Sequence, residues 1–187
     1  LIRIFAEPGR NILPQGSDVA LGKCGLHAGQ CISPGIAGLL AGAGHSMIPV
    51  VRNPVVGIVG TGDEIVEPGP PLTEGKLYAS NITTIAGWCN KQKMKTLMVI
   101  VKDDYSTMLN ALETITEKTD VLITSGGAWT GDRDMVARVL DELGWQQLFH
   151  RIRIGPGKAV GFGTLNGKPV FILPGGPSSN IMGFLQI

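Results

Sequence analysis

The sequence has few aromatic or charged side chains, and its charges nearly cancel. Aromatic residues make up 5% of the chain and charged residues 17%, with 16 basic and 15 acidic side chains and a formal net charge of +1. This balance gives no electrostatic reason to expect nucleic acid or an anionic membrane as a partner. No apolar run in the sequence approaches the roughly 18 residues that a membrane-spanning helix needs, so no membrane partner is expected.

Cysteine is also scarce. The three cysteines, Cys24, Cys31 and Cys89, are an odd number without the close spacing of metal ligands. Neither a disulfide framework nor a structural zinc site is expected, and a cytoplasmic location fits this cysteine content.

Glycine and proline, in contrast, are abundant. The chain holds 27 glycines and 12 prolines beside a hydrophobic fraction of 43%, which indicates a globular fold with many tight loops rather than disorder. Its 187 residues suffice for one ordinary domain and an appendage. A start at Leu1 rather than at Met suggests a piece of a longer protein.

The pattern predicts two parts, residues 1–52 and residues 53–187. In the first, Val19, Leu21 and Leu26 are scattered as in short β segments, and Ser33 followed by Pro34 is a helix start that Gly44 can end. We expect a small β-rich segment with one short helix there.

Residues 53–187 alternate between apolar runs and helical periods. Buried strands are predicted at residues 55–59, 96–101, 121–124 and 170–173, with helices after Ser80, after Asp103 or Asp104, and over residues 135–143. Asn166-Gly167 predicts a hairpin. This alternation is typical of an α/β fold with a mostly parallel sheet covered on both faces.

Each predicted strand is followed by a turn rich in glycine or carboxylate. The turns are residues 60–64 (GTGDE), 102–104 (KDD), 125–134 (SGGAWTGDRD) and 174–180 (PGGPSSN). Because parallel strands end at one edge of a sheet, we expect these turns to meet around one pocket. Backbone N–H groups of glycine turns and helix N-termini favour a phosphate-bearing ligand.

The same edge carries six carboxylates: Asp63, Glu64, Asp103, Asp104, Asp132 and Asp134. Carboxylates beside an anion pocket repel its ligand unless a cation intervenes, and Mg²⁺ is the expected cation. Taken singly, GTGDE and PGGPSS also fit ordinary loops and the Asp103-Asp104 pair fits a helix cap. The joint placement of the turns carries the functional interpretation.

In combination, the motifs resemble those of the MoeA/gephyrin E-domain family, the molybdopterin molybdenumtransferases. The motifs are GTGDE followed by EPGPPL, then Tyr78-Ala79-Ser80-Asn81, SGGAWTGDRD, GPGKAVGFG and LPGGP. The resemblance covers residues 54–187 and implies a three-layer α/β/α sandwich, a homodimer, and molybdopterin and molybdate as substrates.

The resemblance also implies site residues. Asp103 and Asp134 match aspartates of the metal-dependent transfer step, with Asp63 in the first turn as a further metal ligand or a structural residue. Lys158 matches a lysine suited to molybdate or phosphate. The remaining matches and candidates are pterin-binding: Ser125, Gly126, Gly127, Trp129, Asp132, Pro174, Gly175, Pro177 and Ser179.

Five positions depart from the family pattern, of which Gly155 and Ala159 alter the turn around Lys158. Trp129 stands in place of a serine, Ala79 in place of an acidic residue, and Gly176 in place of an asparagine. Trp129 can stack on a pterin or adenine but cannot donate a hydroxyl hydrogen bond. Binding is therefore better supported than turnover.

Three functions follow in order of preference. The first is binding of adenylylated molybdopterin and Mg²⁺-supported molybdate insertion with release of AMP. The second is a non-catalytic module that carries or senses molybdopterin, and the third is a competence-damage-like hydrolase domain acting on nucleotide derivatives.

Overall fold

The computed structural model describes residues 7–23, 25–127 and 135–187. The chain divides into two units, one ending at Val51 and one spanning Arg52–Ile187. Among the described residues, no helix has the length and apolar character needed to cross a membrane.

The first unit contains one short helix, α1 (Pro34–Gly42). The Ser33 hydroxyl accepts the Ile36 N–H and Pro34 occupies the first turn, so the predicted helix start is confirmed. The short β segments expected around Val19, Leu21 and Leu26 are not formed: the described residues of this unit contain no strand. Turns at Gly16, Gly22 and Gly29, all with positive φ, redirect the chain before an extended segment can pair.

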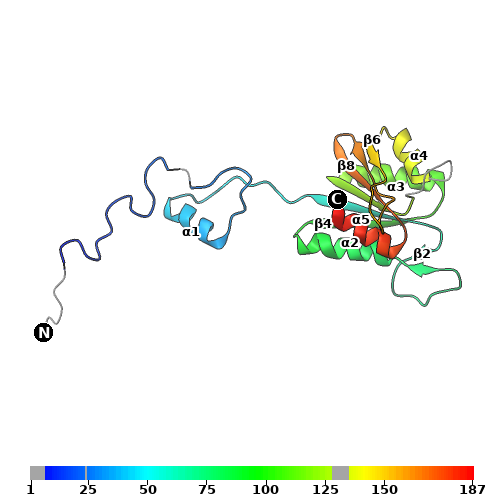
Figure 1. The fold of residues 1–187 in the computed structure, drawn as a ribbon, viewed down its shortest axis with the longest axis horizontal. Helices are drawn as coiled ribbons and strands as arrows, with labels where there is room; N and C mark the ends of the chain where they lie inside the picture. Colours follow the sequence, from blue (N-terminus) through cyan, green and yellow to red (C-terminus); the bar gives the residue numbers. More distant parts are fainter. Residues whose placement is uncertain (1–6, 24, 128–134) are drawn as a thin grey trace. The chain divides into compact units, whose positions relative to one another are not determined.

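The second unit is built on a six-stranded sheet (Figure 1). Its strand order is β4-β1-β5-β8-β7-β6, with parallel pairing among the first four strands and antiparallel pairing of β7 with both β8 and β6. The strands are β1 (Val55–Thr61), β4 (Lys95–Val101), β5 (Val121–Ser125), β6 (Gln146–His150), β7 (Gly161–Leu165) and β8 (Lys168–Leu173). Two short strands, β2 (Ile65–Val66) and β3 (Leu77–Tyr78), pair separately.

Helices cover both faces of the sheet. Figure 1 shows α2 (Ser80–Lys91) and α5 (Pro177–Gln186) on one face, and α3 (Tyr105–Lys118) and α4 (Met135–Glu142) on the other. Strand β1 is buried on both sides: Ile58 packs in the core that includes Ile85 of α2, and Val59 in the core that includes Leu112 of α3. The predicted three-layer α/β/α sandwich is confirmed.

The hairpin predicted at Asn166-Gly167 joins β7 to β8, and both turn residues have positive φ, as two-residue hairpin turns require. Strand β6 was not predicted, because its sequence QQLFH lacks a buried apolar run and it lies at the sheet edge with most of its side chains exposed.

Candidate functional site

The turns that follow the parallel strands leave the same edge of the sheet. Thr61 at the end of β1 is in register with Val101 at the end of β4, and Ser125 at the end of β5 is in register with Leu173 at the end of β8. Hydrogen bonds join the turns to these ends: Gly62 N–H donates to the Val101 carbonyl (3.2 Å) and Gly126 N–H to the Leu173 carbonyl (2.9 Å). The described parts of these turns thus lie at one edge of the sheet, as expected, but residues 102–104 line neither of the two cavities found there.

Gly126 is where two of the turns pack most closely. Its φ of +110° is unfavourable for any side chain, and a Cβ at this position would collide with the Thr61 hydroxyl and lie 3.0 Å from the Thr61 carbonyl oxygen. A Cβ built on Gly175 would lie 3.8 Å from the Gly126 Cα. Glycine at 126 therefore allows the turn after β5 to lie between the end of β1 and the turn after β8.

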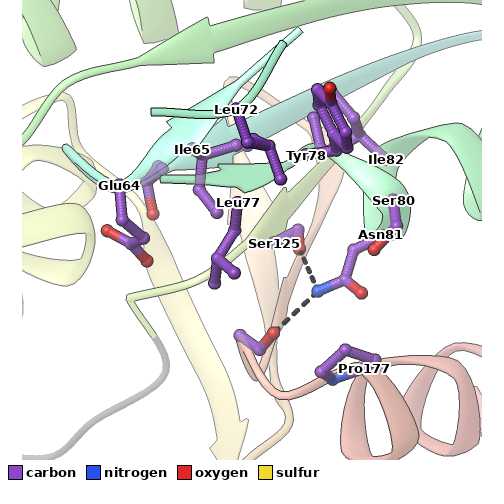
Figure 2. A pocket seen from close by; sticks show the side chains of 14 residues that line it. Glu64, Ile65, Leu72, Leu77, Tyr78, Ser80, Asn81, Ile82, Ser125 and Pro177 are labelled. Atoms are coloured by element: carbon purple, nitrogen blue, oxygen red, sulfur yellow. Dashed lines mark hydrogen bonds between the residues drawn. The ribbon is translucent and has the colours of Figure 1, made fainter. Parts of the chain in front are cut away.

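Ser125 is the centre of a hydrogen-bond network between two helices and the sheet, and Figure 2 shows the branch through Asn81. Its hydroxyl oxygen accepts from Asn81 Nδ2 of α2 (3.3 Å) and from Asn180 Nδ2 of α5 (3.0 Å). The same two amides donate to the turn after β8, Asn81 to the Gly175 carbonyl (2.7 Å) and Asn180 to the Pro174 carbonyl (2.9 Å). The network ties both helix N-termini to the sheet edge.

A cavity of ≈ 470 Å³ opens beside this network. In Figure 2, Leu72 and Tyr78 lie above Ser125 and Asn81, and Leu77 lies to the left of Ser125. The lining combines an apolar wall with a polar end: Gly60, Thr61, Glu64, Ile65, Leu72, Leu77, Tyr78, Ala79, Ser80, Asn81, Ile82, Ser125, Gly175 and Pro177. A cavity lined in this way can hold a planar ring against its apolar wall and a polar substituent at its polar end.

A second cavity of ≈ 470 Å³ shares Gly175 with the first. Its lining brings together the turn at residues 156–158 and the start of α5: Arg151, Pro156, Gly157, Lys158, Ala159, Pro174, Gly175, Gly176 and Ser179. A Cβ on Gly157 would lie 3.3 Å from the Ser179 carbonyl oxygen, so these two segments are in direct contact. The two basic side chains make this cavity suited to an anion.

Predicted site residues divide between the two cavities. Ser125 and Pro177 line the first, Lys158, Pro174 and Ser179 line the second, and Gly175 lines both. Gly126 and Gly127 continue from Ser125 with positive φ. Trp129, Asp132 and Asp134 lie outside the described residues.

The predicted carboxylates separate into two kinds. Asp104 accepts the Thr107 N–H (2.8 Å) as the N-cap of α3, and its hydrogen bonds with Thr107 and Ser106 lower its pKa. Asp104 is therefore a helix cap. Asp63 and Asp103 are paired instead: the Asp103 N–H donates to Asp63 Oδ1 (3.2 Å).

The pKa of the Asp103 carboxyl is raised, first by burial and then by the negative charges of Asp63 and Glu64. A cation would relieve this repulsion, and Mg²⁺ binds through one or two carboxylates together with substrate phosphates. The donor set thus fits Mg²⁺ shared with a ligand. Within residues 7–23, 25–127 and 135–187, no three histidine, cysteine, aspartate or glutamate side chains are grouped to hold a metal by themselves.

The sequence reasoning missed two polar lining residues, Asn81 of the first cavity and Arg151 of the second, and one residue of the Ser125 network, Asn180. Asn81 and Asn180 stand inside the quoted motifs YASN and PGGPSSN, one and three residues into helices that start at the sheet edge. Their position at helix starts was a usable signal. Arg151 lies in RIRIGPGK, where its basic charge near the Lys158 turn gave a weaker signal.

Comparison with known proteins gives consistent matches. Residues 57–187 match the family model described as "Probable molybdopterin binding domain". The chain is 33% identical over 179 residues to the molybdopterin molybdenumtransferase of Bacillus subtilis (strain 168), covering 95% of the chain and 42% of that protein. It is 34% identical over 182 residues to the molybdopterin molybdenumtransferase of Haemophilus influenzae, covering 97% of the chain and 45% of that protein.

Among solved structures, the molybdopterin biosynthesis MoeA protein from Pyrococcus horikosii aligns with a TM-score of 0.80 at 32% identity, over 96% of this chain and 45% of that one. These matches confirm the family resemblance drawn from the motifs. The chain spans less than half the length of these relatives.

Proposed function

The chain belongs to the family of molybdopterin-binding domains, and from this we propose that it binds molybdopterin and supports molybdate insertion during molybdenum cofactor biosynthesis. The observation that carries the proposal is the pair of cavities that meet at Gly175. One has an apolar wall and a hydroxyl at its end, and the other has two basic side chains. A pterin phosphate and an oxyanion can thus lie side by side at one sheet edge.

In this proposal the first cavity holds molybdopterin. The ring lies against the apolar wall formed by Leu72, Leu77 and Tyr78. Ser125, Gly126 and Gly127 face the phosphate, with Pro177 and Gly175 bounding the same end. Trp129 and Asp132 complete this set as predictions from the sequence.

The second cavity takes molybdate. Lys158 supplies positive charge to the oxyanion, and Ser179 and Arg151 lie around the same space. The relatives named molybdopterin molybdenumtransferases support molybdate as the anion, and tungstate is the chemical competitor to include in every measurement.

Asp63, Asp103 and Asp134 are the residues proposed to hold Mg²⁺. When bound there, Mg²⁺ would neutralise the phosphate charges of an adenylylated ligand. The carboxylates of Asp63 and Asp103 would anchor that charge at the ends of β1 and β4, and Asp63 precedes Glu64, which lines the first cavity. We further propose release of AMP as molybdate is inserted, a homodimer for the longer protein, and a location in the cytoplasm.

Calorimetric titration of adenylylated molybdopterin into the longer protein, with and without Mg²⁺, tests this function. We expect binding that strengthens with Mg²⁺, and AMP release only when molybdate and Mg²⁺ are both present. Binding unaffected by Mg²⁺ would contradict the role of the carboxylates. Absence of binding would contradict the proposal as a whole.

One observation favours a second function, binding without turnover. Ala79 is buried and lines the first cavity at the N-cap of α2, where the family resemblance implies an acidic residue. A cavity with a methyl group at this position can hold molybdopterin while lacking a carboxylate for the transfer step. Tight binding with no AMP release under any combination of Mg²⁺ and molybdate would identify a carrier or sensor.

A further inference from the structure

The hydrogen-bond network around Ser125 determines which way its hydroxyl hydrogen points. Asn81 Nδ2 faces the Gly175 carbonyl and Asn180 Nδ2 faces the Pro174 carbonyl. A carbonyl oxygen only accepts hydrogen bonds, so each asparagine must direct its NH₂ group, and not its oxygen, toward these carbonyls. The orientation of both side-chain amides is thereby fixed.

Both of these NH₂ groups also donate to Ser125. With Nδ2–Oγ distances of 3.3 Å from Asn81 and 3.0 Å from Asn180, they occupy the two acceptor positions of the hydroxyl oxygen. The hydroxyl is then left with its own hydrogen, which it can only donate. Ser125 is 6% exposed and lines the first cavity, so a ligand in that cavity can accept this hydrogen.

The helix N-termini beside Ser125 favour a negatively charged acceptor, and Glu64, which lines the same cavity, lies away from Ser125 on its other side (Figure 2). The helices α2 and α5 both begin at this end of the cavity, and neither N-terminus is capped by a side chain or has an acidic residue in its first turn. Uncapped N–H groups and the positive ends of the helix dipoles stabilise an anion. These features stand independently of the Ser125 network and point to the same class of ligand group.

We infer that Asn81 and Asn180 are positioning residues that fix the Ser125 hydroxyl as a hydrogen-bond donor to a phosphate oxygen of the ligand. The inference rests on the proposed function, since molybdopterin supplies the phosphate. It assigns a specificity: this end of the cavity accepts a phosphate and rejects a group that must itself donate a hydrogen bond.

A double-mutant cycle tests the inference on the longer protein. The variants are Asn81→Ala, Ser125→Ala and the double variant, with molybdopterin and its dephosphorylated form as the two ligands in calorimetry. Asn81 is half-buried, whereas Asn180 is 2% exposed, so Asn81 is the position better able to tolerate replacement. Asn90→Ala, on the exposed surface at the other end of α2, is the matched control.

We expect Ser125→Ala to weaken molybdopterin binding about ten- to a hundredfold, the value of a hydrogen bond to a charged acceptor. Asn81→Ala should weaken binding about tenfold in the native background and by less than about twofold in the Ser125→Ala background, because it acts through that hydroxyl. Binding of the dephosphorylated ligand should change by less than about twofold in all variants.

Two results would overturn the inference. Additive losses in the cycle would mean that Asn81 acts by holding the turn at Gly175 and not through Ser125. Equal losses for both ligands would mean that the hydroxyl does not face the phosphate. If the native protein binds neither ligand, both the proposed function and the inference fail. If the native protein binds molybdopterin tightly but the losses in the cycle are additive, only the inference fails.

Discussion

The Asp103 backbone N–H donates to the side chain of Asp63 at 3.2 Å, which brings the ends of β4 and β1 together at the sheet edge. This contact places the two carboxyl groups close enough for the charge of Asp63 to raise the pKa of Asp103. Burial is the largest cause of the raised pKa, and the charge of Asp63 is the second. Negative charge collected in this way favours binding of a cation.

The substitution Asp63→Asn should therefore separate stability from metal binding. Without Mg²⁺ it removes repulsion while keeping an oxygen to accept the Asp103 N–H, so the pKa of Asp103 should fall toward its ordinary value. The melting temperature at neutral pH should rise by a few degrees at most. Mg²⁺ should then stabilise the variant less than the native chain in thermal melts.

The sign of the pH dependence follows from the raised pKa. Asp103 holds its proton more tightly in the folded than in the unfolded chain, so its contribution to stability is largest below the ordinary aspartate pKa and is lost as pH rises through the raised value. Carboxyl titration by NMR should show this raised value in the native chain and a lower one in Asp63→Asn. An unchanged titration of Asp103 would contradict the pairing.

Arg52 and Asp120 should give the opposite pH dependence. The guanidinium forms two contacts of 2.6 Å with the carboxylate, which also accepts the Val55 N–H at 2.8 Å where β1 begins. These hydrogen bonds, with that of Arg52 the largest, hold the pKa of Asp120 far below its usual range. The contribution of these hydrogen bonds to stability is fully present above the ordinary aspartate pKa and is lost as the pH falls toward the lowered pKa of Asp120.

The substitution Arg52→Gln tests this relationship. Because the pair is exposed to solvent, we expect a small loss of stability at pH 7 that shrinks with added salt. The difference in melting temperature between the native chain and Arg52→Gln should narrow as pH is lowered below 4 (about the ordinary aspartate pKa). A difference that is constant over this pH range would show that the charge pair does not contribute.

The sequence predicted those parts of the fold whose signal is local. Apolar runs such as residues 55–59 are buried on both faces, and the Asn166-Gly167 turn has a backbone conformation that few other residue pairs adopt. Strand β6 has no such signal, since its pairing with β7 is set by the hairpin beside it and its side chains remain largely exposed.

The site was predictable to the extent that topology brings strand ends together. The position of Ser125 and Gly175 at the site follows from this rule alone, because each lies at or just after the end of a parallel strand. The division into two cavities does not, because it depends on how the turn at residues 156–158 packs against the start of α5. The network of Asn81 and Asn180 with Ser125 joins residues 44 and 55 positions apart, and no local pattern encodes such a contact.

Gly126→Ala should destabilise the chain more than backbone strain alone explains. A methyl group there meets the Thr61 side chain and lies 3.0 Å from the Thr61 carbonyl, in addition to the unfavourable φ. We expect a loss of about 2–4 kcal/mol, from strain and overpacking together. Gly144→Ala is the control: its φ of +90° is similarly unfavourable, but nothing lies within 4 Å of the added methyl.

Chemical denaturation of both variants measures the difference. Gly144→Ala should cost about 1–2 kcal/mol, the strain term. Equal losses in the two variants would mean that Thr61 moves aside without cost, and that the turn after β5 is less tightly held against β1 than its contacts indicate.

Lys158 offers a test of the second cavity that does not depend on the first. Lys158 and Arg151 line the space beside Ser179, and an oxyanion bound there would exchange part of its water shell for donors of these side chains. Lys158→Met keeps the length of the side chain and removes the charge, so we expect molybdate binding to weaken about tenfold or more and to lose part of its dependence on ionic strength.

Lys118→Met, at the exposed C-terminal turn of α3, is the control and should leave binding unchanged. Binding of dephosphorylated molybdopterin should be the same in both variants, since we propose that this ligand binds in the other cavity. If Lys158→Met instead weakens the pterin and leaves molybdate unaffected, the assignment of the two cavities is reversed.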